Sequence, residues 1–186
     1  MPDRPLFGAL LRMGELLRPI LPAARQRKVP AKSSGGVWPA ERHTRTMLVL
    51  EACAQPSATP NVNRATARVL DQLGVSLIAA RKAGCCGAVA HHLSDHARGL
   101  VAIKQNIDAW WPHIEAGAEA IVITASGCGV MVKEYGHLLA NDAAYAEKAK
   151  RVSDLCRDIA EVLSAEDLTR LKVRNAGTLA FHSPCT

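Results

Sequence analysis

Short apolar runs alternate with segments of helical hydrophobic spacing along most of this 186-residue chain. Buried strands are predicted by the apolar runs at residues 46–52, 75–80, 118–125 and 177–182. Helices are predicted, from apolar positions three and four residues apart, at 61–73, 88–116 with a break near Gly99, 129–140 and 143–163. Strands separated by helices indicate βαβ units. The pattern therefore predicts an α/β fold, with a mainly parallel sheet and flanking helices.

The first 45 residues, here called the leader, differ from the rest of the chain in charge. The whole chain has a net charge of +6, and the leader holds nine basic and three acidic side chains, so the remaining residues are neutral. The spacing predicts an amphipathic helix at about 6–18, followed by an extended linker. A basic leader can contact a membrane surface or an acidic subunit; a solvated linker between domains is the simpler alternative. The neutral body argues against a nucleic-acid partner.

Export and membrane insertion are not expected from the sequence. No apolar run is long enough to cross a bilayer as a helix. The N-terminal apolar stretches are interrupted by Arg12, Glu15 and Arg18, unlike those of a signal peptide. We therefore expect a cytoplasmic protein with reduced cysteines, and such cysteines typically bind metal or take part in catalysis.

Five of the six cysteines follow predicted strands. In strand order they are Cys53, the adjacent pair Cys85 and Cys86, Cys128, and Cys185. Because the carboxyl ends of parallel strands meet at one edge, where ligands bind, we expect these thiols to converge. Cys156 falls within a predicted helix, and we interpret it as a core residue.

Several thiols at one edge suit a soft metal ion or an iron–sulfur cluster. Glycines flank both the adjacent pair and Cys128, and glycine lets the backbone approach a cluster and direct N–H groups at its sulfur atoms. Adjacent cysteines serve a polynuclear cluster more naturally than one tetrahedral zinc ion. A zinc-stabilised structural module is an alternative. Another is a thiol–disulfide enzyme built on the pair near Arg81 and Lys82, although the chain lacks C-x-x-C.

Histidines near the cysteines are further candidates. His92 and His96 lie four residues apart beside His91, as in helical metal sites, but H-E-x-x-H is absent. We interpret these three as surface or supporting residues, and His182 as the better candidate to support a ligand. The pair Trp110-Trp111 is predicted to pack rather than to carry electrons.

The order Cys53, Cys85-Cys86-Gly87, Cys128 resembles the cysteine-rich CCG domain family. Within it, the segments MLVLEACAQPSATPNVNRATARVLDQLGVSL, AGCCGAVAHHLSDHARGLVAIKQNIDAWWPHIEAGAEAIVITASGCGVMVKEYGHLL and FHSPCT are similar to the iron–sulfur subunits of glycolate oxidase (glycolate dehydrogenase). A heterodisulfide-reductase-like or lactate-utilisation CCG protein is the alternative. The full CCG pattern ends in Cys-x-x-Cys, whereas here positions 125 and 131 are Ala and Met. A four-thiolate set therefore fits better than a five-thiolate one.

The resemblance implies a cluster, with the 4Fe–4S type expected, bound by Cys53, Cys85, Cys86 and Cys128, and a metal-ligand role for Cys185 in a second repeat. It implies an electron-transfer subunit whose flavin-containing partner subunits, with FAD, oxidise glycolate to glyoxylate and whose electrons pass towards the respiratory chain. It is also compatible with a peripheral location on the inner face of the cytoplasmic membrane. The family's ferredoxin-type C-x2-C-x2-C-x3-C-P runs are absent from the sequence. We therefore expect a fragment: a leader at 1–45, a first CCG domain at 46–174 and the start of a second at 175–186.

Overall fold

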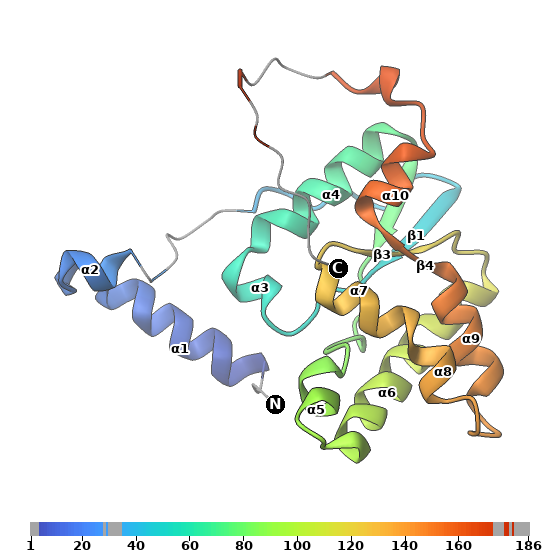
Figure 1. The fold of residues 1–186 in the computed structure, drawn as a ribbon. Coiled ribbons are helices and arrows are strands. Elements are labelled where there is room, and N and C mark those ends of the chain that lie inside the picture. Colours follow the sequence, from blue (N-terminus) through green and yellow to red (C-terminus); the bar gives the residue numbers. More distant parts are fainter. Residues whose placement is uncertain (1–3, 28, 30–34, 173–176, 179, 181–186) are drawn as a thin grey trace.

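A computed structural model describes residues 4–27, 29, 35–172, 177–178 and 180, and it contains one parallel sheet (Figure 1). The strands are β1 (Arg45–Val49), β2 (Val75–Ile78), β3 (Ile121–Ile123) and β4 (Cys156–Asp158). Their order across the sheet is β2-β1-β3-β4, and every neighbouring pair is parallel. The predicted α/β class is confirmed, with strands shorter than the apolar runs that predicted them.

Helices precede the sheet, connect its strands and follow its last strand. They are α1 (Arg4–Leu17), α2 (Ala23–Gln26), α3 (Gln55–Ala58), α4 (Pro60–Gln72), α5 (Ala88–His92), α6 (His96–Glu115), α7 (Ser126–Lys133), α8 (Tyr135–Leu138), α9 (Ala146–Leu155) and α10 (Ile159–Ser164). Short 3-10 turns occur at Arg18–Ile20 and Leu168–Arg170. The predicted helix at 61–73 is confirmed as α4, which ends before Gly74, a residue with a left-handed φ of 85°.

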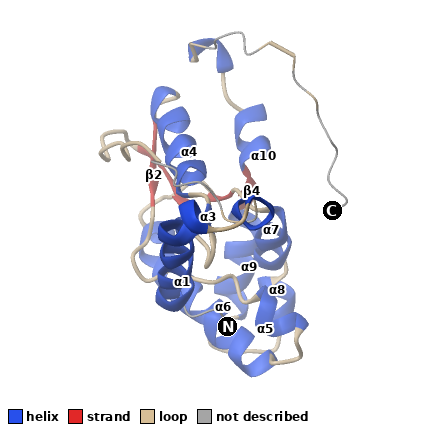
Figure 2. Ribbon diagram, turned by 90° about the vertical axis from the view of Figure 1, so that its left-hand side faces the viewer, coloured by secondary structure: helices blue, strands red, loops and turns tan. Residues whose placement is uncertain are grey.

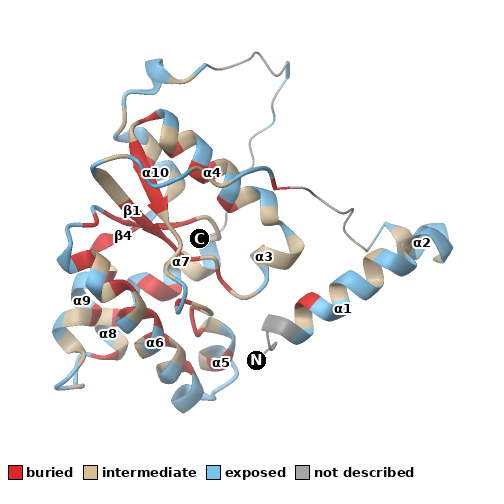
Figure 3. Ribbon diagram, turned by 180° about the vertical axis from the view of Figure 1, so that it is seen from behind, coloured by how far each residue is buried: buried red, intermediate tan, exposed pale blue. Residues whose placement is uncertain are grey.

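The sheet is buried on both faces, which explains why its strands are continuous apolar runs. Alternate residues of β1 point to opposite sides. Leu48 packs in the core cluster with α6, α7, α8 and α9, whereas Met47 and Val49 pack in the cluster with α4 and α10. Figure 2 shows these two helical layers on either side of the strands, and Figure 3 shows the buried residues concentrated between them.

The structure corrects the predicted helix at 143–163. It is interrupted by β4, so Cys156 lies in a strand rather than in a helix. Asp158 accepts a hydrogen bond from the backbone N–H of Ala160, and Glu161 accepts one from the backbone N–H of Asp158, forming a capping box that begins α10. A new helix therefore starts where the hydrophobic spacing alone suggested continuation.

The position of the break in 88–116 also differs from the prediction. The chain leaves the helix at Leu93–Asp95, where Ser94 has a left-handed φ of 63° and Asp95 caps α6 through the N–H of Arg98. Gly99 lies inside α6 and is buried against α5. Its role is close helix packing, not a helix break.

The predicted strand at 177–182 lies largely outside the described residues. Residues 177, 178 and 180, which the structure does describe, are not in a strand. The fourth strand of the described sheet is instead β4.

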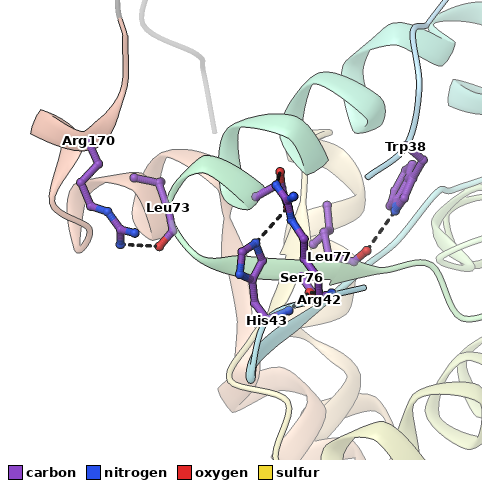
Figure 4. Close-up of polar contacts among 8 residues, drawn as sticks. Trp38, Arg42, His43, Leu73, Ser76, Leu77 and Arg170 are labelled. Carbon is purple, nitrogen blue, oxygen red and sulfur yellow. Dashed lines mark hydrogen bonds and ion pairs between the residues drawn. The ribbon is translucent and has the colours of Figure 1, made fainter. Parts of the chain in front are cut away.

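The leader forms α1, close to the predicted 6–18, and its last described residues pack against the edge strand β2 (Figure 4). Trp38 Nε1 donates to the carbonyl oxygen of Leu77 at 3.1 Å. The backbone N–H groups of Arg42 and His43 both donate to Ser76 Oγ at 3.0 Å. This end of the leader is therefore held against the sheet and is not a free linker.

Among the helices of the described residues, none combines the length and the apolar character needed to cross a bilayer.

Candidate metal centre

The fold brings four of the predicted cysteines to the carboxyl edge of the sheet. Cys53 follows β1, Cys85 and Cys86 follow β2, and Cys128 lies in the first turn of α7, directly after β3. The chain runs from β1 to β2 on one side and then crosses to β3 on the other, so the ends of β1 and β3 flank the topological switch point. This is where open α/β sheets bind ligands.

The four thiols, here called the cysteine rim, interact with one another. All four are free thiols. Hydrogen bonds link Cys53 to Cys85, Cys85 to Cys86, and Cys86 to Cys128. Residues more than 30 positions apart in the sequence are thereby joined, and the predicted convergence is confirmed for these four.

In these hydrogen bonds Cys53 and Cys86 are the donors, and Cys85 and Cys128 are the acceptors. The hydrogen bond from Cys53, followed by that from Cys86, lowers the pKa of Cys85 to about 2. A hydrogen bond from Cys86 likewise lowers the pKa of Cys128. The pKa values of Cys53 and Cys86 are raised, first by these same hydrogen bonds and then by burial. The lowered pKa values of Cys85 and Cys128 favour the thiolate form, which is the ionisation state that binds metals.

Backbone conformation at the rim departs from the ordinary regions at two positions. Ala52, buried directly before Cys53, has φ of 59°, a strained value for a residue with a Cβ. Gly87, directly after the pair, has φ of 91° and is the N-cap of α5. Its N–H donates to Cys85, and the next N–H, that of Ala88, donates to Cys86. The expectation that glycine would help direct N–H groups at sulfur is thus met beside the pair.

Two buried polar residues that the sequence analysis missed support the same loop. Asn106 on α6 and Tyr135 on α8 are both fully buried. Asn106 donates to the carbonyl oxygen of Cys85, and Tyr135 donates to that of Cys86, each at 2.8 Å. The available signal was an asparagine on the apolar stripe that α6 forms with Ile103 and Ile107. A polar residue in such a stripe requires a buried partner.

The donor set of the cysteine rim is four thiols, the ligand type that both iron–sulfur clusters and structural zinc sites use. Within the residues that the structure describes, no group of three or more His, Cys, Asp or Glu side chains is arranged to hold a metal ion. The donor chemistry of the rim therefore fits a soft metal ion or an iron–sulfur group.

The remaining candidates lie away from the rim or outside the described residues. His91 and His96 contact each other through their Nδ1 atoms at 3.2 Å at the α5–α6 junction, and His92 is exposed. Cys156 is fully buried in β4, where burial raises its pKa to about 11, in agreement with a core role. Cys185 and His182 lie outside the described residues.

The two adjacent tryptophans also lie in the packed part of the fold. Trp110 is fully buried, and Lys148 Nζ lies 5.1 Å from the ring centroid of Trp111. Both contacts agree with the predicted packing role.

A cavity of about 760 Å³ lies elsewhere, between α1 and the start of α4. It is lined by residues such as Leu11, Arg12 and Pro56, and it contains no cysteine. Donor chemistry, and not cavity volume, therefore identifies the cysteine rim as the candidate site.

The fold and the rim define a cysteine-rich α/β domain, and residues 47–133 match the family model "CCG: Cysteine-rich domain". The chain is 54% identical, over 187 aligned residues, to "Glycolate oxidase iron-sulfur subunit" of Escherichia coli (strain K12), covering 100% of this chain and 46% of that protein. It is therefore a homologue of that glycolate oxidase iron–sulfur subunit and contains a CCG domain.

More distant relatives carry related names. The chain is 26% identical over 162 residues to "Probable glycolate oxidase iron-sulfur subunit" of Bacillus subtilis (strain 168), covering 87% of this chain and 35% of that protein. It is 31% identical over 129 residues to "Lactate utilization protein A" of Anoxybacillus flavithermus, covering 67% of this chain and 51% of that protein. The chain spans about half the length, or less, of these curated relatives. No solved structure matches it.

Proposed function

We propose that this chain is an iron–sulfur electron-transfer part of a glycolate-oxidising complex, and that Cys53, Cys85, Cys86 and Cys128 hold a cluster of the 4Fe–4S type. The observation that carries the proposal is the convergence of four interacting thiols from three strand ends. The 54% identity over the whole chain to a glycolate oxidase iron–sulfur subunit supports glycolate as the compound that the complex oxidises.

The chain's own residues provide sulfur donors, a partly dry setting and oriented dipoles. Cys86 is 3% exposed, so water is largely kept from that thiol. The N–H groups of Gly87 and Ala88 are directed at the sulfur atoms of the pair, where they stabilise negative charge. When bound, a cluster supplies one-electron redox chemistry whose potential follows such hydrogen bonds and burial. Hydride chemistry on glycolate belongs, in this proposal, to FAD on partner subunits, and electrons continue towards the respiratory chain.

A peripheral contact with the inner face of the cytoplasmic membrane is part of the proposal. Helix α1 turns the side that contains the buried Gly8 towards Ser57 of α3. Its opposite side carries a stripe of leucine and methionine, and Leu6, Leu10 and Met13 are each more than half exposed. An exposed apolar stripe beside the basic residues of the leader has the composition that anionic bilayers attract.

We further propose that the CCG domain extends over 46–174, with a leader at 1–45 and the start of a second repeat at 175–186, where Cys185 would serve that repeat. The matched residues end at 133, but β4 pairs with β3 and α9 packs in the same core cluster as β1. The folded unit therefore continues well beyond the matched segment.

Anaerobic reconstitution of the chain with iron and sulfide tests the proposal. We expect bound iron and sulfide, visible absorption and an EPR signal on reduction, all lost in Cys85→Ser. Cys156→Ala is the matched control, because it removes a buried cysteine outside the rim and should retain the cluster. Stoichiometric zinc with no iron–sulfur absorption or EPR signal would establish the zinc-stabilised module instead. Undiminished metal binding in Cys85→Ser and Cys86→Ser would favour the thiol–disulfide alternative.

A further inference from the structure

The loop that carries the adjacent cysteines is held from below by one buried hydrogen-bond network. Asn106 uses its whole amide group: Oδ1 accepts from the N–H of Gly84 at 2.7 Å, and Nδ2 donates both to the carbonyl oxygen of Cys85 at 2.8 Å and to Tyr135 Oη at 3.1 Å. Tyr135 Oη then donates to the carbonyl oxygen of Cys86 at 2.8 Å. Two side chains therefore bind one backbone group in each of three consecutive residues of the loop, Gly84, Cys85 and Cys86.

Burial of these two polar side chains would destabilise the protein if their polar atoms had no hydrogen-bond partners. Asn106 and Tyr135 are fully buried, among apolar neighbours that include Ile103 and Ile107. A buried amide or hydroxyl without partners destabilises a protein by about 1–3 kcal/mol. Here every polar atom of the two side chains has a partner; three of the four bonds they make end on the loop, and the fourth joins the two residues to each other. The network thus serves the geometry of the Gly84–Cys86 backbone.

Adjacent residues on an extended chain point their side chains in opposite directions. Cys85 and Cys86 nevertheless both reach the rim, Cys85 contacting Cys53 and Cys86 contacting Cys128. The loop backbone must therefore hold an unusual course through the pair, and its carbonyl oxygens must turn away from the thiols. Those carbonyl oxygens are the two atoms that Asn106 and Tyr135 bind.

We propose that Asn106 and Tyr135 are positioning residues that hold the Cys85-Cys86 backbone so that both thiols face the rim together. The proposal rests on the proposed function only in treating those thiols as ligands. Neither side chain needs to touch a bound group, since each acts through a carbonyl oxygen of the pair.

The test measures how quickly iodoacetamide alkylates each cysteine of the full chain without metal, with site-resolved mass spectrometry. Cys86 is 3% exposed and Cys156 is fully buried, so both react only when the structure opens. In Tyr135→Phe and Asn106→Leu we expect Cys86 to react roughly 5- to 150-fold faster, the equivalent of about 1–3 kcal/mol for a lost buried partner. Cys156 reports global opening of the structure. Its alkylation rate should therefore rise only by the factor that the variant's loss of overall stability accounts for.

Two further variants separate positioning from general destabilisation. Ile107→Val removes a methyl group from the same helix but keeps every hydrogen bond of the network, and Tyr145→Phe removes a hydroxyl that bonds Asp108 instead. Any effect of these controls should raise the Cys86 and Cys156 rates together. Equal rises of the two rates in Tyr135→Phe and Asn106→Leu, or no rise, would overturn the proposal.

Reconstitution with iron and sulfide distinguishes this proposal from the proposed function. If the wild type forms a cluster, we expect Tyr135→Phe to shift its midpoint potential and EPR line shape, and selective opening of Cys86 without either shift would overturn the positioning role. If the wild type forms no cluster, the proposed function fails. The alkylation rates alone then decide whether Asn106 and Tyr135 hold the pair.

Discussion

Replacing Gly87 by alanine should destabilise the protein sharply. Gly87 has φ of 91°, and an added Cβ would lie 3.0 Å from the carbonyl oxygen of Gly99 and 3.4 Å from a side-chain carbon of Ile103. The nearest of these atoms is backbone of α6, which cannot rotate away as a flexible side chain can. The substitution therefore combines an unfavourable backbone conformation with a close contact between the thiol loop and the long helix behind it.

The two costs can be estimated separately. A left-handed conformation costs a residue with a Cβ about 1–2 kcal/mol, and crowding of a packed interior typically adds about 1–3 kcal/mol. Alanine also restricts the unfolded chain, which offsets about 0.4–1 kcal/mol of this loss of stability. We expect a net loss of about 2–3 kcal/mol, or roughly 4–12 °C in melting temperature for a chain of this length.

Gly84→Ala is the matched control, because Gly84 flanks the other side of the cysteine pair, has no left-handed φ, and a Cβ there meets nothing within 4 Å. Its N–H, which bonds Asn106 Oδ1, is kept in alanine. Urea denaturation of both variants without metal should leave Gly84→Ala within about 1 kcal/mol of the wild type. Equal stability losses in the two variants would refute the assignment of Gly87 to a close backbone approach.

Three other changes test separate parts of the structure. Glu166→Gln should cost about 0.5–1 kcal/mol at pH 7. Because Arg45 lowers the pKa of Glu166 below its ordinary 4.5, the difference from the wild type should shrink below pH 4.5 and vanish once the pH has fallen through that lowered pKa, as urea titrations at a series of pH values from 7 downwards would show. Ser76→Ala removes the acceptor for two backbone N–H groups, so trypsin should cut within residues 35–44 several-fold faster, by about the factor that 1 kcal/mol implies. The double variant Leu10→Ser, Leu17→Ser should bind anionic vesicles at least about tenfold more weakly in sedimentation assays, and equal binding would exclude α1 as the contact.

The positions of the rim cysteines could be predicted from the sequence because the carboxyl ends of parallel strands lie at the same edge whatever the order of the strands in the sheet. Apolar runs marked β1, β2 and β3, and each was followed by a cysteine within a few residues. The rule that the carboxyl ends of parallel strands share one edge then predicts that Cys53, Cys85, Cys86 and Cys128 lie together.

The errors have local causes that hydrophobic spacing does not encode. Cys156 was placed in a helix because apolar residues continue at helical spacing through β4, and only the capping box of Asp158 and Glu161 shows that a second helix begins there. Gly99 was interpreted as a break because glycine is a poor helix former, whereas its lack of a side chain allows α6 to approach α5. Tertiary contact decided both cases.

Asn106 and Tyr135 were missed for a different reason. Their roles depend on hydrogen bonds across 21 to 49 positions of sequence, to the carbonyl oxygens of Cys85 and Cys86. No periodicity predicts which buried polar residue meets which loop. An asparagine within the apolar stripe of a helix was nevertheless a usable warning that a polar partner lay opposite.

The cysteine rim also has a consequence for the order in which the protein is built. Because Cys53, the Cys85-Cys86 pair and Cys128 come from three separate connections, the donor set exists only after all three strands are paired. Anything that bridges these thiols acts as a cross-link, closing loops of roughly 30 to 40 residues and removing conformational entropy from the unfolded chain. Loading of the rim therefore has to follow folding, and once loaded the rim would resist unfolding.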